Sequence, residues 1–151
     1  MRKLIILIIP IVLSCNTKSI LKEYNYSEDF YLYFENTFNA SLKDQGLKHL
    51  FVIPLSSCTP CVNASLNLFL EINREDVGII TVGLPDNSKT FQLVNKIYSL
   101  NKVWLDDKEE LTKYRTNIGS PYYLSIKNGE IKQGLEIDES KIEQLKTIFK
   151  R

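Results

Sequence analysis

One stretch of the sequence decides the fold, and it runs Leu50-Phe51-Val52-Ile53-Pro54-Leu55-Ser56-Ser57-Cys58-Thr59-Pro60-Cys61. Its first half is apolar on both sides, which is typical of a strand buried on both faces of a sheet. The apolar spacing over residues 62–72 predicts a helix immediately afterwards. Cysteines separated by two residues can close a small disulfide and open it again. The stretch therefore predicts a strand, a pair of redox-capable thiols and a helix, in that order.

Apolar periodicity predicts a regular alternation of strands and helices on either side of this stretch. We expect strands over residues 21–26, 49–55, 77–83, 122–126 and 131–137, an extended piece over 103–105, and helices beginning at Ser27, after Cys61, at Asn87 or Ser88, at Asp107 and at Asp138. Asn128-Gly129 is a strong hairpin signal between the last two strands. Parallel units followed by a hairpin and a helix predict an α/β three-layer sandwich with a central mixed sheet.

Apolar stripes predict which side of each helix is buried. In the first helix, Phe30, Phe34, Phe38 and Leu42 recur every four residues, so we expect one continuous helix that ends at Gly46. In the helix after residue 87, the inward positions are expected to be Phe91, Val94, Ile97 and Tyr98. The acidic residues Asp106, Asp107, Glu109 and Glu110 are expected to form the solvated start of a short helix, with Asp107 in a capping box.

The composition fits a single globular domain. The chain has 151 residues, of which 25% are charged and 44% hydrophobic, and its net charge is +1. We find no basic patch that would indicate a nucleic-acid partner. The cysteine pair and His49, the one histidine, fall short of the four ligands of a structural zinc site, so neither a metal nor another cofactor is expected.

The N-terminus has the pattern of an export signal. Arg2-Lys3 precedes ten residues, 4–13, that are too short to span a bilayer, which takes about 20 residues. They end in Val12-Leu13-Ser14-Cys15, which resembles the lipobox of bacterial lipoproteins. We expect residues 1–14 to be removed, Cys15 to carry lipid, residues 15–20 to form a tether and residues 21–151 to form the domain. The alternative is an ordinary signal peptide with an incidental cysteine.

This expectation places the domain in the cell envelope, lipid-anchored and facing the periplasm or the exterior. Export would also put Cys58 and Cys61 in a compartment where disulfides persist. Because Cys15 is assigned to lipid, the other two cysteines have only each other.

Residues 21–151 resemble the thioredoxin fold, and an exported, tethered member is most similar to the TlpA/ResA-like thiol–disulfide oxidoreductases. The resemblance depends on Cys58-Thr59-Pro60-Cys61 and on Ser120-Pro121 before a strand and an Asn-Gly turn. It implies a cis-proline at Pro121 that lies against the disulfide, and a substrate-binding surface made of Thr59, Pro60, Ser120 and Pro121. The implied partners are cysteine-containing exported proteins and a membrane or periplasmic redox partner.

The chemistry of the pair follows from its place at the start of a helix. The thiolate is the attacking species, and a helix N-terminus stabilises it. We therefore expect Cys58 to attack and the more buried Cys61 to resolve the mixed disulfide. Two positions depart from the thioredoxin pattern, because Ser57 replaces a tryptophan and Val52 replaces a buried aspartate. A non-catalytic binding module with a static disulfide, or a structural lipoprotein, remains the alternative.

Overall fold

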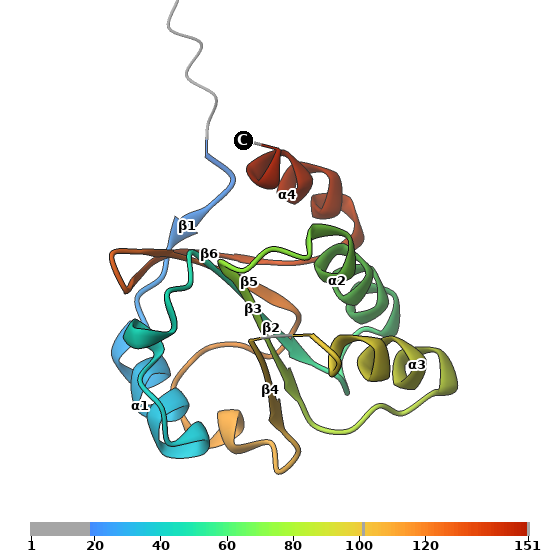
Figure 1. The fold of residues 1–151 in the computed structure, drawn as a ribbon, viewed down its shortest axis with the longest axis horizontal. Coiled ribbons are helices and arrows are strands. Elements are labelled where there is room, and N and C mark those ends of the chain that lie inside the picture. Colours follow the sequence, from blue (N-terminus) through green and yellow to red (C-terminus); the bar gives the residue numbers. More distant parts are fainter. Residues whose placement is uncertain (1–18, 101, 151) are drawn as a thin grey trace, which may run out of the picture.

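The computed structural model describes residues 19–100 and 102–150, which form one mixed sheet with helices on both faces (Figure 1). The expected signal peptide, the lipid site at Cys15 and most of the tether lie outside the described residues. Within the described part, no helix has both the length and the apolar character needed to cross a bilayer.

The elements follow one another as strand and helix up to a C-terminal hairpin. They are β1 (Lys22–Glu23), α1 (Ser27–Phe38), β2 (His49–Pro54), α2 (Thr59–Ile72), β3 (Val77–Val82), α3 (Ser88–Ile97), β4 (Val103–Asp106), β5 (Tyr122–Lys127), β6 (Glu130–Glu136) and α4 (Ile142–Phe149). Single turns of 3-10 helix lie at Leu42–Gln45, Glu110–Lys113 and Glu139–Lys141. The prediction of an α/β fold with a mixed sheet and a terminal hairpin and helix is confirmed.

The sheet has the strand order β1-β6-β5-β2-β3-β4. The neighbours β2, β3 and β4 are parallel, whereas β5 pairs antiparallel with β2 and β6 pairs antiparallel with β5. The carboxyl ends of β2, β3 and β4 therefore meet at one edge of the sheet, and the chain enters β5 at that same edge. This edge holds the loops 55–58, 83–87, 107–109 and 116–121, and we call it the redox edge because the two cysteines lie there.

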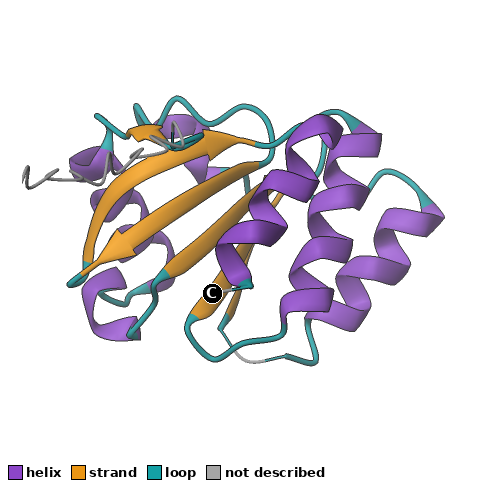
Figure 2. Ribbon diagram, turned by 90° about the horizontal axis from the view of Figure 1, so that it is seen from above, coloured by secondary structure: helices purple, strands orange, loops and turns teal. Residues whose placement is uncertain are grey.

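Both faces of the sheet are covered (Figure 2). Figure 1 shows α2, α3 and α4 on one face and α1 on the other. Along β2, Phe51 and Ile53 pack in the core under α2, α3 and α4, while Leu50 and Val52 pack in the core under α1. All four side chains are fully buried, which explains why β2 is a continuous apolar run.

Several local predictions are confirmed. The side chain of Asn87 caps α3 by accepting a hydrogen bond of 2.9 Å from the backbone N–H of Thr90. Asn128 and Gly129 have φ values of 54° and 75°, as a tight hairpin of right-handed twist requires. The helix after the cysteines begins slightly earlier than expected, at Thr59, and ends at Ile72.

Other boundaries were wrong. The first strand is only Lys22–Glu23, and the first helix ends at Phe38 because Asn39 adopts a left-handed conformation with φ 50°. Leu42 is still buried, but in a separate 3-10 turn. Phe91 of α3 is 54% exposed, and Tyr98, which follows the last residue of α3, is 40% exposed, so neither belongs to the core stripe.

Candidate functional site

The two cysteines lie where β2 passes into α2, at the redox edge. The backbone N–H of Leu55 donates a hydrogen bond of 2.9 Å to the carbonyl of Val82, which extends the β2–β3 pairing by one residue. The chain then turns at Ser57, whose backbone N–H and hydroxyl both donate to the carbonyl of Pro54, at 3.2 and 2.7 Å. This turn ends the strand and directs the chain into the helix at Cys58.

Cys58 is the N-cap of α2, and its carbonyl accepts the first helical hydrogen bond, from Val62, at 2.9 Å. Pro60 lies in the first helical turn, where its missing N–H has no partner to lose. The helical turn brings Cys58 and Cys61 to a Cα separation of 5.3 Å, and their sulfur atoms form a disulfide. The prediction of a closed Cys58–Cys61 pair is confirmed.

The two cysteines differ in exposure. Cys58 is exposed, together with Pro60, while Cys61 is half-buried. Ser65 donates a hydrogen bond of 2.8 Å to the carbonyl of Cys61, one turn further along α2. Cys58 is therefore the more accessible of the two cysteines to an incoming thiol, and the order of attack inferred from the sequence stays a prediction.

Electrostatic stabilisation at the pair comes from the backbone. The first turn of α2 contains no acidic residue, and residues 55–60 contain no charge of either sign. The unpaired N–H groups at the helix start supply partial positive charge instead. This field favours a thiolate at Cys58 once the disulfide is open.

The Ser120-Pro121 segment lies at the same edge. Tyr122 pairs with Val52 in the β2–β5 register, so the same register places Pro121 opposite Ile53 and Ser120 opposite Pro54. Pro121 is buried and Ser120 half-buried. The fold thus brings Ser120 and Pro121 to the end of the strand that leads into the cysteine pair.

The expectation of a cis bond at Pro121 is contradicted. Every peptide bond in the described residues is trans, including the one between Ser120 and Pro121. The carbonyl of Pro121 accepts a hydrogen bond of 2.7 Å from the backbone N–H of Ile137, which continues the β5–β6 pairing beyond Tyr122. An extended proline can open a strand in this way, because its first position needs no N–H donor.

No carboxylate takes the place of the missing aspartate at Val52, which is fully buried. Among the described residues, Asp106 is the one acidic side chain in the buried set, at 2% exposed. It ends β4, and the register Pro54–Val82–Asp106 puts it two strands away from the end of β2. Sequence reasoning missed its burial, because Asp106 was expected to be part of a solvated acidic cluster.

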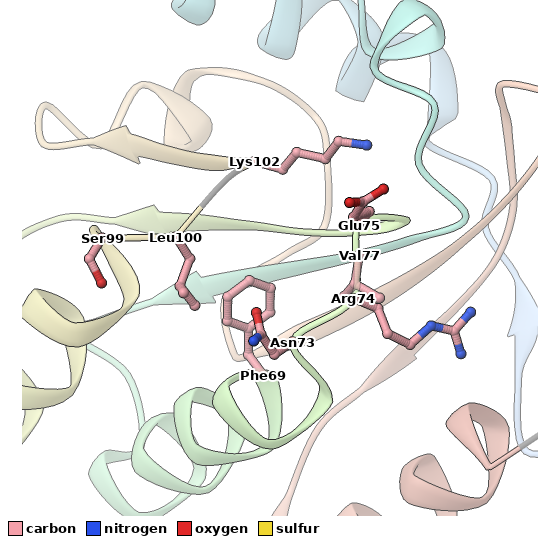
Figure 3. A pocket seen from close by; sticks show the side chains of 8 residues that line it. All are labelled: Phe69, Asn73, Arg74, Glu75, Val77, Ser99, Leu100 and Lys102. Atoms are coloured by element: carbon pink, nitrogen blue, oxygen red, sulfur yellow. The ribbon is translucent and has the colours of Figure 1, made fainter.

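One cavity lies far from the cysteines. It is an open hollow of about 380 Å³ at the C-terminal end of α2, lined by Phe69, Asn73, Arg74, Glu75, Val77, Ser99, Leu100 and Lys102 (Figure 3). The cysteines are at the other end of this helix, about 20 Å away for its fourteen residues. The hollow therefore has no part in thiol chemistry at the redox edge.

His49 has a structural environment. Its Nδ1 lies 2.6 Å from the hydroxyl of Tyr123, and its ring makes an edge contact with Phe149 of α4. Burial lowers the pKa of His49, so the neutral ring that accepts from Tyr123 is favoured. Among residues 19–100 and 102–150, no three His, Cys, Asp or Glu side chains are grouped as metal ligands would be.

Comparison with known proteins adds no assignment to this geometry. No family model matches the chain, and no curated protein matches it significantly.

Proposed function

We propose that the protein is an extracytoplasmic thiol–disulfide oxidoreductase of thioredoxin-like fold, whose redox centre is Cys58 and Cys61. The observation that carries the proposal is an exposed cysteine at the N-cap of a helix, bonded to a half-buried cysteine one turn later. This geometry gives one sulfur access to partners and keeps the second within reach of the first.

The sheet supports the thioredoxin-like part of this proposal. Its central order β6-β5-β2-β3 combines two parallel strands with an antiparallel hairpin, and the helix that begins at the cysteine pair directly follows β2. Placement of Ser120 and Pro121 beside the end of β2 is the arrangement in which an extended partner backbone could pair next to the disulfide. Thr59 and Pro60, between the sulfurs, would complete this contact surface.

The exchange proceeds in two balanced steps. In the reduced protein, the Cys58 thiolate attacks one sulfur of a partner disulfide, and the other partner sulfur leaves as a thiolate that takes up a proton. Cys61 then attacks the Cys58 sulfur, which closes the Cys58–Cys61 disulfide and releases the second partner thiol. Two electrons pass from the cysteine pair to the partner. The reverse sequence oxidises a partner dithiol, and a membrane or periplasmic redox partner would restore the starting state.

The location in this proposal comes from the sequence. Removal of residues 1–14 and lipid on Cys15 would tether the domain to a bacterial membrane, facing the periplasm or the exterior. Its substrates would then be cysteine-containing exported proteins, which share that compartment.

The insulin disulfides provide a direct test. The reduced wild-type protein should reduce them, and Cys61→Ser should accumulate an insulin–Cys58 mixed disulfide because nothing resolves it. Cys58→Ser should form none. Mass spectrometry of acid-quenched samples measures all three outcomes. Equal exchange by Cys58→Ser and the wild type would contradict the assignment of Cys58.

A second candidate function is a binding module with a static disulfide. It is favoured by the surroundings of Val52, where no carboxylate is available to move a proton from Cys61, since Asp106 is occupied by its own hydrogen bonds. A wild-type pair that stays unreactive toward insulin, yet is reduced by concentrated dithiothreitol, would support this candidate.

A further inference from the structure

Two segments beside the cysteine pair carry no charged side chain. Residues 55–60 and residues 116–121 contain no Asp, Glu, Lys or Arg, although charged residues make up 25% of the chain. The β2–β5 register brings these two segments to the same edge. A partner segment that lies across these two segments therefore meets hydroxyl, apolar and backbone groups. The charged side chains of this edge lie in the loops after β3 and β4, where Asp86 and Glu109 are exposed.

Leu84 adds an apolar side chain to this edge. It is 67% exposed, more than any other large apolar side chain of the described residues. Val82, two residues earlier, accepts the hydrogen bond from Leu55, so the loops that bear Leu84 and Cys58 leave neighbouring strands side by side. Gly83 begins the turn with φ 80°, and its N–H donates to the carbonyl of Asp106 at 2.8 Å.

The loop that carries Leu84 is held to the helix of the cysteine pair. Asn87 caps α3, and the Thr90 hydroxyl donates a buried hydrogen bond of 3.0 Å to Oδ1 of Asn63 in α2. Since Asn63 and Thr90 both lie near the starts of their helices, α2 and α3 begin together at the redox edge. The exposure of Leu84 is thus fixed by anchored neighbours on both sides of its loop.

We propose that Leu84 is a specificity-determining residue, which selects an extended partner segment whose reactive cysteine is flanked by apolar, uncharged residues. This inference rests on the proposed function. Its physical basis is that apolar contact with Leu84 removes apolar area from water.

The test uses the oxidised full-length domain and two synthetic peptides. Each has one reduced cysteine, flanked by leucines in one peptide and by serines in the other. The peptide, in large excess, attacks the Cys58 sulfur as a thiolate to form a peptide–Cys58 disulfide, and Cys61 leaves as a thiolate that takes up a proton. Because Cys61 can reverse this step, the net reaction is completed by a second peptide thiolate, which attacks the bound peptide's sulfur, forms a peptide disulfide and leaves Cys58 and Cys61 reduced. Mass spectrometry gives the rate, which is divided by the rate of the same peptide with oxidised glutathione to correct for its intrinsic reactivity.

The wild type should prefer the leucine peptide by about tenfold, the scale at which one apolar contact discriminates. Leu84→Asp should abolish the preference and leave the reaction with dithiothreitol unchanged. Leu32→Asp is the matched control, since Leu32 is 52% exposed on α1, on the opposite face of the sheet, and it should retain the preference.

The outcomes separate the two proposals. If the wild type reacts quickly with both peptides but without preference, or if Leu84→Asp keeps the preference, the role of Leu84 is wrong and the redox function stands. If dithiothreitol opens the disulfide but neither peptide reacts, the redox function itself fails. A wild-type dimer that Leu84→Asp converts to a monomer would show that a second copy covers Leu84, and would overturn the inference.

Discussion

The hydroxyl of Tyr33 donates a hydrogen bond of 3.1 Å to Oδ2 of Asp106, which joins α1 to the end of β4. The same carboxylate accepts backbone N–H bonds from Glu110 at 2.8 Å and Leu111 at 2.9 Å. Asp106 is only 2% exposed, so its charge is stabilised by these three donors rather than by water. Burial and the neighbouring carboxylate of Asp106 raise the pKa of Tyr33, which keeps its hydroxyl a donor.

Replacing this carboxylate should destabilise the domain. Asp106→Ala removes the acceptor for three donors and should lower the free energy of unfolding by about 2 to 4 kcal/mol. Asp107→Ala is the matched control, because Asp107 is exposed and should change the stability by less than about 0.5 kcal/mol. Urea denaturation measures both. Equal effects of the two variants would show that the Asp106 carboxylate does not stabilise the 3-10 turn Glu110–Lys113.

The role of Asp106 as the cap of the 3-10 turn Glu110–Lys113 was not predicted from the sequence. Of the four acidic residues within 106–110, the sequence pointed to Asp107 as the cap, because Asp107 and Glu110 have capping-box spacing. The structure uses Asp106 instead, since its position at the end of β4 directs it toward Tyr33 of α1. Residue 33 is distant in sequence, so no local pattern carries this information.

A second buried polar contact joins the helices at the redox edge. The Thr90 hydroxyl and Oδ1 of Asn63 form a hydrogen bond of 3.0 Å, and the two residues are 1% and 8% exposed. Thr90→Val should cost about 1 to 3 kcal/mol, because the buried Asn63 oxygen is left without its donor.

A double-mutant cycle isolates this bond. The variant that combines Asn63→Leu with Thr90→Val should lose less stability than the sum of the two single variants, since no polar atom is then stranded. Urea denaturation gives the four stabilities. Strict additivity would mean that the hydrogen bond makes no specific contribution.

His49 makes stability depend on pH near neutrality. Burial lowers the pKa of His49, and of the charged groups around it Asp76 opposes this effect while Arg74 and Lys48 reinforce it. The unfolded chain therefore binds a proton at a higher pH than the folded chain. Between the folded pKa of His49 and its ordinary value of 6.5, stability must rise with pH.

We expect the free energy of unfolding to fall as the pH is lowered from about 7.5 to about 5. His49→Asn, which keeps an acceptor for Tyr123 but does not titrate, should remove this slope. His49 is the only histidine of the chain, and the pKa of Asp76 is already lowered, so Asp76 titrates below this range. Denaturant titrations at several pH values measure the slope, and an equal slope in His49→Asn would assign it elsewhere.

Short-range signals predicted much of the fold and the core of the site. The strand, the cysteine pair and the helix over residues 50–72 all depend on residues close in sequence, as do the Asn87 cap and the Asn128-Gly129 turn. The conformations of Pro121 and Asn39 were not predictable in this way. The carbonyl of Pro121 is paired with Ile137, which is distant in sequence, and the left-handed conformation of Asn39 interrupts an apolar period that continues to Leu42.

The unequal exposure of the two cysteine residues leads to a last prediction. After reduction, Cys58 should react with iodoacetamide several times faster than Cys61, because Cys58 is exposed at the N-cap of α2 while Cys61 is half-buried. Peptide mapping by mass spectrometry at short reaction times gives both rates. In 6 M guanidinium chloride the helix and the burial are lost, so the two rates should become similar. A ratio that stays the same on unfolding would show that the folded environment of α2 does not distinguish the two thiols.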